Sequence, residues 1–256
     1  MTGTTDPIDD VSFTFEWYES LLKLLQSEDR KFRTFEDDVD GGTVLYRHDV
    51  DWSPRKAVEL GRIEAEHDVT ATYFFLVTSP FYNPQTEAVR SAIEKLADLG
   101  HEIGLHFSTH QYDVDESTPL EKVAERVDRE GRILGEAAGT SVDVVSFHNP
   151  PDWILRETFE DFVSTYEPRF FETVEYRADS NQRWRETHPF ADGVPDPLQV
   201  LTHPVLWGER DAWAVDRLRE ERDYHAVGID EHLARTDRTW ESPLGIGRLD
   251  DDGPLY

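Results

Sequence analysis

The sequence predicts an α/β fold in which a parallel sheet is covered by helices. Short apolar runs of strand length alternate along the chain with longer segments of helical periodicity, and this alternation is typical of repeated strand–helix units. No Gly/Ser-rich linker, low-complexity block or fixed-period repeat divides the 256 residues, so we expect one domain. An open doubly wound sheet and a closed barrel both fit this pattern. In either one, functional residues gather at the carboxyl ends of the strands.

The first elements are defined by apolar periodicity and by capping residues. A helix is expected over residues 13–29, before the first strand at 42–50. The next segment, 53–68, is predicted to be a helix because Ser53 can cap it and Pro54 suits its first position.

A second strand–helix unit follows directly. Residues 70–77, "TATYFFLV", are rich in β-branched and aromatic side chains, which favour a strand. Residues 86–100 predict a helix with Thr86 as its cap and Gly100 as its stop. A short strand is expected at 101–107.

The second half of the chain repeats the pattern with longer helices. A helix with a bend at Gly131 is expected over 117–139, followed by a strand at 142–148. Another strand is expected at 197–204, and a long helix at 209–236 ends the predicted elements.

Composition excludes several kinds of function. The chain has 54 acidic and 26 basic residues, a formal net charge of −28, and it shows no basic patch of the kind that nucleic-acid binding requires. Many acidic residues with few lysines are typical of halophilic proteins, in which concentrated salt screens self-repulsion; an acidic protein without this adaptation is the alternative. The absence of cysteine excludes disulfides, thiolate ligands and thiol nucleophiles.

The ends of the chain differ from its centre. We expect a flexible N-terminus at 1–12, one domain at 13–248 and an acidic tail at 249–256. The first residues, "MTGTTDPIDD", lack the basic and apolar regions of a signal peptide. No stretch approaches the ~20 apolar residues of a membrane span, so a cytoplasmic protein without a membrane span is expected.

Two aspartates end the first predicted strand. In "VLYRHDVDW", Asp49 and Asp51 are two residues apart and therefore point to one side of the strand, whereas His48 and Val50 point to the other. Two adjacent carboxylates repel each other, and burial penalises their charges further. A bound cation would relieve both effects. The alternative is that Asp51 caps the following helix.

A histidine pair follows a later strand. In "HEIGLHFSTH", His106 and His110 are four residues apart, and both imidazoles can converge on one ion from a helical turn or a tight loop. Together with Asp51 they would leave coordination positions open for water and substrate, as catalytic zinc sites do. The alternative is one exposed histidine and one core histidine.

Two further strand ends carry a histidine before proline. His148 lies in "SFHNPP", which includes Pro150, and His203 lies in "LTHP". Each could instead be a hydrogen-bonded structural histidine. Between them, "YRADSNQRWR" at 176–185 is polar and contains a tryptophan, and an ordinary surface loop is its alternative.

The order of these motifs resembles the polysaccharide deacetylases of carbohydrate esterase family 4. The resemblance runs from about Tyr46 to Trp207, and "RHDVD" and "HEIGLHFSTH" are its most specific parts. It implies a distorted (β/α) barrel of about seven strand–helix units with residues 13–248 as the catalytic domain. It also implies a divalent metal ion, with zinc expected, and hydrolytic removal of an N-acetyl group from a carbohydrate or another small N-acetylated substrate.

The same resemblance assigns residue roles. It implies Asp49 as the catalytic base and His203 as the general acid, with Asp51, His106 and His110 as metal ligands. Residues expected at the substrate are His148, Pro150, Asp179, Trp184 and Trp207.

This sequence departs from the family pattern at two points. The third motif normally has an arginine that braces the base, and His148 stands there instead. The paired aspartates are normally adjacent, and here Val50 separates them, as in a branch with an Asp-Val-Asp motif. Three other functions therefore stay open: an amidohydrolase of non-sugar molecules on the same scaffold, a non-catalytic glycan-binding homologue, and a non-haem iron oxygenase, which also uses two His and one carboxylate.

Overall fold

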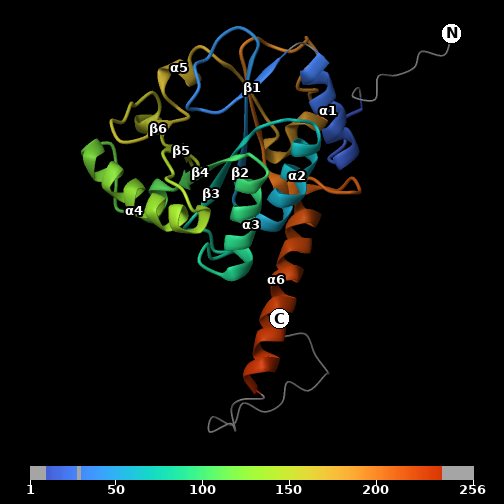
Figure 1. The fold of residues 1–256 in the computed structure, drawn as a ribbon, viewed down its shortest axis with the longest axis vertical. Coiled ribbons are helices and arrows are strands. Elements are labelled where there is room, and N and C mark those ends of the chain that lie inside the picture. The colour runs from blue at the N-terminus through green and yellow to red at the C-terminus, as the bar shows by residue number, and fades with distance from the viewer. Residues whose placement is uncertain (1–9, 28–29, 238–256) are drawn as a thin grey trace, which may run out of the picture.

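The computed structural model describes residues 10–27 and 30–237, and a curved parallel sheet forms its centre (Figure 1). The strands are β1 (Lys31–Arg33), β2 (Thr43–Val50), β3 (Thr72–Leu76), β4 (Glu102–Phe107), β5 (Val144–Phe147), β6 (Val163–Ser164), β7 (Glu175–Ala178) and β8 (Leu198–Thr202). The helices are α1 (Phe15–Ser27), α2 (Pro54–Glu66), α3 (Glu87–Asp98), α4 (Leu120–Ala138), α5 (Pro168–Phe171) and α6 (Ala214–Asp237).

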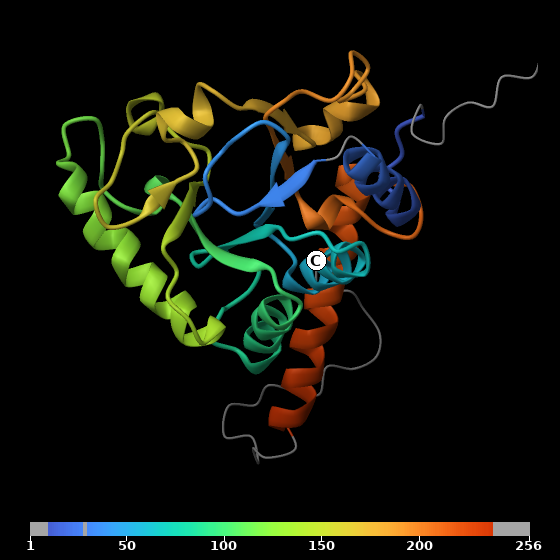
Figure 2. The same cartoon turned by 45° about the horizontal axis from the view of Figure 1, so that its top comes forward.

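The sheet is a barrel that remains open on one side. Its strand order is β6-β5-β4-β3-β2-β8-β7, and β1 pairs with the first half of β2. Every pairing among these strands is parallel, and none joins β6 to β7 in the part of the chain that the structure describes. Helices α1 to α4 lie outside the sheet (Figure 2). The predicted distorted (β/α) barrel is confirmed.

The longer predicted elements are present, and their ends follow the expected local chemistry. Ser53 caps α2, because its hydroxyl accepts a hydrogen bond from the Lys56 N–H at 3.3 Å. Gly100 follows α3 with a φ of +90°, a conformation that suits glycine. Thr86 occupies the N-cap position of α3, but its side chain makes no capping bond. Helix α4 continues without interruption through Gly131.

The interior of the barrel changes from apolar to polar along β2. Leu45, Arg47 and Asp49 share one face of this strand, since side chains alternate across a strand. Leu45 belongs to an apolar cluster with Phe35, Phe74, Val144 and Phe170. Strand β4, the neighbour of β3, contributes Gly104, where an added Cβ would lie 2.5 Å from the Phe74 ring of β3. Phe74 can therefore fill the barrel only because glycine faces it, and the polar residues are left at the carboxyl end.

The predicted ends of the chain lie mainly outside the described residues. Of the expected flexible N-terminus, residues 1–9 are outside, and the expected acidic tail at 249–256 is entirely outside. Within residues 10–27 and 30–237, no helix combines the length and apolar character that crossing a bilayer requires.

Candidate metal centre and active site

Four strands deliver the candidate site residues to one edge of the sheet. Asp49 and Asp51 come from the end of β2, His106 from β4, His148 from the residue after β5, and His203 from the residue after β8. Because the strands are parallel, their carboxyl ends meet at the same edge, where α/β proteins bind ligands.

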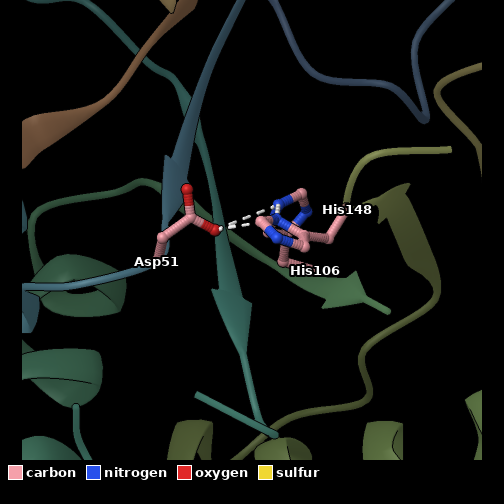
Figure 3. Close-up of side chains that lie close together, drawn as sticks. All are labelled: Asp51, His106 and His148. Carbon is pink, nitrogen blue, oxygen red and sulfur yellow. Dashed lines mark hydrogen bonds and ion pairs between the residues drawn. The ribbon is translucent and has the colours of Figure 1, made fainter. Parts of the chain in front are cut away.

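Three of these side chains form a compact group of ligand atoms. Asp51 Oδ1 lies 3.3 Å from His106 Nε2 and 3.2 Å from His148 Nδ1 (Figure 3). The two imidazole nitrogens are 3.1 Å apart. A tetrahedral ion with bonds of about 2.1 Å separates its ligand atoms by about 3.4 Å, so the triangle is close to the size that zinc requires. Asp51, His106 and His148 are therefore a candidate metal site.

The surroundings of the triangle also suit a cation. Asp51 Oδ1 is buried and lacks a hydrogen bond of regular geometry from any described residue. His106 Nδ1 lies 3.0 Å from the Ser146 carbonyl oxygen, and an N–H there would leave Nε2 as the free ligand atom. His148 Nε2 is 2.9 Å from the Asn149 side-chain amide. If the Asn149 amide is rotated so that its oxygen and nitrogen exchange places, the oxygen can accept a hydrogen bond from His148 Nε2–H. His148 Nδ1 is then the free ligand atom.

The predicted ligand His110 lies outside this group, and its role as a ligand stays a prediction. His110 belongs to the short 3-10 turn Thr109–Gln111, and its imidazole is exposed. Its Nε2 is 3.2 Å from the Asn149 carbonyl oxygen. The turn after β4 directs His110 toward the neighbouring loop, whereas His148 enters the site from β5. The candidate group therefore contains His148, which the sequence analysis expected at the substrate.

Asp49 is held by an arginine that the sequence analysis missed. Arg47 Nη2 donates to Asp49 Oδ2 at 3.0 Å, and both side chains are buried. Burial alone would raise the pKa of Asp49, but the charges of Arg47, His106 and His203 together more than offset it and hold the pKa below its usual range. Asp49 Oδ2 is 3.7 Å from His106 Nε2, beside the ligand triangle. The i, i+2 spacing of Arg47 and Asp49 on one strand was the available signal.

Arg47 is itself fixed inside the barrel. Its Nη1 donates to Thr165 Oγ1 at 2.8 Å. Its guanidinium carbon lies 5.6 Å from the ring centres of both Phe74 and Tyr166. A guanidinium between two aromatic rings gains cation–π stabilisation. The resemblance implies an arginine that braces the base from the third motif. Here Arg47 makes that contact from the first.

His203 is held by a buried carboxylate. Its Nδ1–H donates to Asp179 Oδ1 at 2.6 Å, while Asp179 Oδ2 accepts from the His203 backbone N–H and from Trp207 Nε1–H, both at 2.9 Å. Burial alone would lower the pKa of His203, but the Asp179 charge and hydrogen bond, together with the charges of Asp49 and Asp51, raise it to about 9. His203 Nε2 lies 4.0 Å from Asp51 Oδ2, so the second ring nitrogen faces the site.

Three residues that were predicted to contact substrate are buried, and such contacts stay predictions. Asp179 is fully buried and orients His203 instead of facing a ligand. Trp184 and Trp207 are 4% and 0% exposed. Both pack in an aromatic cluster with Phe13 and Trp17 and offer no free ring face. Pro150 is half-buried beside His148, and its contact with substrate stays a prediction.

The fold and the ligand atoms define an α/β barrel protein with a candidate metal site at the carboxyl edge of its sheet. No protein-family model matches the chain, and no curated protein matches it. Several solved structures do. A family 4 acetyl xylan esterase from Clostridium thermocellum is 16% identical over 63% of this chain and 73% of that chain, with a TM-score of 0.41.

Two proteins from Bacillus anthracis are also similar. A family 4 carbohydrate esterase is 16% identical over 81% of this chain and 86% of that chain, with a TM-score of 0.40. A CE4 family pseudoenzyme, BA3943, is 18% identical over 74% of this chain and 60% of that chain, with a TM-score of 0.41. All three belong to the esterase family that the sequence motifs resemble. At these identities the likeness concerns the fold alone.

Proposed function

We propose that this protein is a metal-dependent hydrolase that removes an N-acetyl group from an amino sugar or glycan. One arrangement supports the proposal: a carboxylate, Asp49, and an imidazole, His203, lie on two sides of one candidate metal site. Asp49 is paired with arginine and stays ionised, whereas His203 is paired with aspartate and stays protonated near neutral pH. Two groups whose environments separate their pKa values in this way suit the roles of base and acid.

The triangle of Asp51, His106 and His148 would hold the metal, for which we propose zinc. When bound, a divalent cation supplies Lewis-acid chemistry, which polarises a carbonyl oxygen and acidifies water. The residues present fit this ion, because two imidazoles and one carboxylate occupy three positions of a tetrahedron and leave the fourth open.

The chain's own residues perform the proton transfers. Asp49 accepts a proton from the attacking water, and Arg47 keeps its carboxylate ionised and oriented. His203 donates a proton from Nε2 to the departing amine while Asp179 holds Nδ1–H. An amine is a poor leaving group without this proton, so a protonated imidazole suits amide hydrolysis. Acetate and a free amine are the products.

The first experiment measures acetate release from the pentamer of N-acetylglucosamine after zinc loading. Asp49→Asn should keep its bound zinc, measured by elemental analysis, and lose most of its turnover. Asp98→Asn, at the exposed end of α3, is the matched control and should leave both unchanged. Acetate release by Asp49→Asn at the wild-type rate would contradict the assignment of the base.

A second substrate tests the acid. His203→Ala should slow acetate release from the N-acetylated pentamer far more than hydrolysis of 4-nitrophenyl acetate, because nitrophenolate leaves without a proton. Equal slowing of both substrates would contradict the role of His203. If the wild type hydrolyses other N-acetylated amides but not the sugar, the protein is a non-sugar amidohydrolase.

A further inference from the structure

A second buried polar cluster lies on the opposite face of β2 from Asp49. It contains His48, Glu64, Tyr18 and Tyr73, each with 0% of its surface exposed. The Glu64 carboxylate accepts hydrogen bonds from the hydroxyls of Tyr18 and Tyr73. His48 Nε2 lies 2.8 Å from Glu64 Oε1. The cluster joins α1, α2, β2 and β3, and none of its members faces the candidate metal site.

Stability alone gives little reason to keep such a cluster. Desolvation of a buried carboxylate costs several kcal/mol, and well-packed apolar residues are often as stable as a buried ion pair. Burial alone would raise the pKa of Glu64, but the charges of His48 and His101 and the hydrogen bonds from His48 and Tyr18 together more than offset it, and the pKa is lowered. Glu64 therefore stays ionised inside the protein. One attested use of such buried charges is to fix the relative placement of elements.

The cluster has one connection to the active site. His48 Nδ1 is 2.7 Å from the hydroxyl of Thr202 on β8. His48 and Thr202 are also the last paired residues of β2 and β8 before the carboxyl ends of these strands. The next residue on β2 is Asp49, and the next residue on the β8 side is His203. This side-chain contact thus joins the two strands at their last paired residues, immediately before Asp49 and His203.

We propose that His48, held by the Glu64 carboxylate, is a positioning residue that fixes the distance between Asp49 and His203. This inference rests on the proposed function, which makes those two residues the base and the acid. Both transfers must occur in one substrate pose: Asp49 accepts a proton from water, and His203 donates a proton to the departing amine. A misplacement of either group by about 1 Å can cost about 100-fold in rate.

The test removes the tie without touching the catalytic groups. Thr202→Val keeps the shape of the side chain and removes the hydroxyl. We expect its kcat for the N-acetylglucosamine pentamer to fall about 10- to 100-fold, with KM and bound zinc unchanged. Thr202→Ser restores a hydroxyl and should restore kcat.

His101→Gln is the matched control. His101 is buried, contacts the same carboxylate at 3.7 Å and accepts a hydrogen bond from the Ala71 N–H, whereas none of its hydrogen bonds or ion pairs with the described residues reaches β8. The His101→Gln variant should have a lower melting temperature than the wild type and an unchanged kcat. A wild-type kcat in Thr202→Val, or an equal loss of kcat in His101→Gln, would overturn the inference.

Crystal structures of wild type and Thr202→Val separate this inference from the proposed function. If the wild type releases no acetate, the proposed function is wrong, but the distance from the Asp49 carboxylate to His203 Nε2 can still be measured. An increase of about 0.5 Å or more in Thr202→Val supports the positioning role, since catalytic groups need placement within about that tolerance. An unchanged distance refutes it.

Discussion

Replacing Asp179 with asparagine should shift the pH dependence of catalysis. All three groups that contact Asp179 are hydrogen-bond donors: His203 Nδ1–H, the His203 backbone N–H and Trp207 Nε1–H. An ionised carboxylate only accepts hydrogen bonds and satisfies all of them. Asparagine offers one accepting oxygen, so its NH2 group must face at least one donor. The variant therefore loses both the charge and part of the hydrogen bonding that hold His203.

The size of the shift follows from the pKa of His203. It is raised from 6.5 to about 9 in the folded protein, with Asp179 as the main cause of the increase. At pH 8, the protonated fraction of His203 is about 90% with a pKa of 9 and about 3% with a pKa of 6.5. Full loss of the shift therefore predicts about a 30-fold loss of kcat at pH 8. At pH 6 the protonated fractions differ by only about 1.3-fold.

The assay is the pH profile of acetate release from pH 5.5 to 9.5 for wild type and Asp179→Asn. The alkaline limb of the variant should move toward lower pH, and part of the activity lost at pH 8 should return at pH 6. Asp211→Asn is the control, because Asp211 also accepts from a backbone N–H, that of Phe13, but does not contact His203. If Asp179→Asn loses the same factor at every pH, Asp179 does not act through the protonation of His203.

Four other substitutions test separate parts of the site and the fold. Arg47→Met leaves Asp49 buried without its partner and should reduce the free energy of unfolding by about 3–5 kcal/mol in urea titrations; an unchanged value would contradict the brace. His148→Ala should lose zinc affinity by competition titration and His110→Ala should keep it; the reverse order would restore the ligand set predicted from sequence. Burial raises the pKa of the Glu130 carboxyl from 4.5 to about 7. The folded state therefore binds the carboxyl proton more tightly than the unfolded state does, and stability is lost as the pH rises from 4.5 to about 7. Glu130→Gln should thus be more stable than wild type by up to about 3 kcal/mol at pH 8 and equal to it at pH 4; a gain of the same size at both pH values would refute this reasoning.

The fold was predictable where elements are long enough to show a period. Helices α2 and α3 have strong apolar periodicity and clear end signals, so their positions followed from the sequence. Strands β1, β6 and β7 are two to four residues long and were missed. Such short segments form because neighbouring strands offer hydrogen bonds, and no local pattern in the sequence encodes that.

The proximity of two candidate ligands was predictable from the sequence, but the rest of the site geometry was not. Parallel strand ends bring together Asp51 and His106, as the sequence pattern places them. The exchange of His110 for His148 depends on the direction of the chain after β4 and β5, which the four-residue spacing does not contain. The burial of Trp184 and Trp207 results from packing against α1, far away in sequence. Only the assembled fold shows that these rings are covered.

The location of Arg47 has a consequence for how this scaffold can change during evolution. Because the arginine and Asp49 are two residues apart on one buried strand, the rigid pleat of the sheet fixes their separation. The loop after β5 therefore does not have to supply a residue that holds Asp49. It places His148 beside Asp51 instead. Insertions and substitutions in that loop can then alter which molecules enter without disturbing Asp49. Diversification of this protein's relatives should accordingly concentrate in the loop and spare the strand.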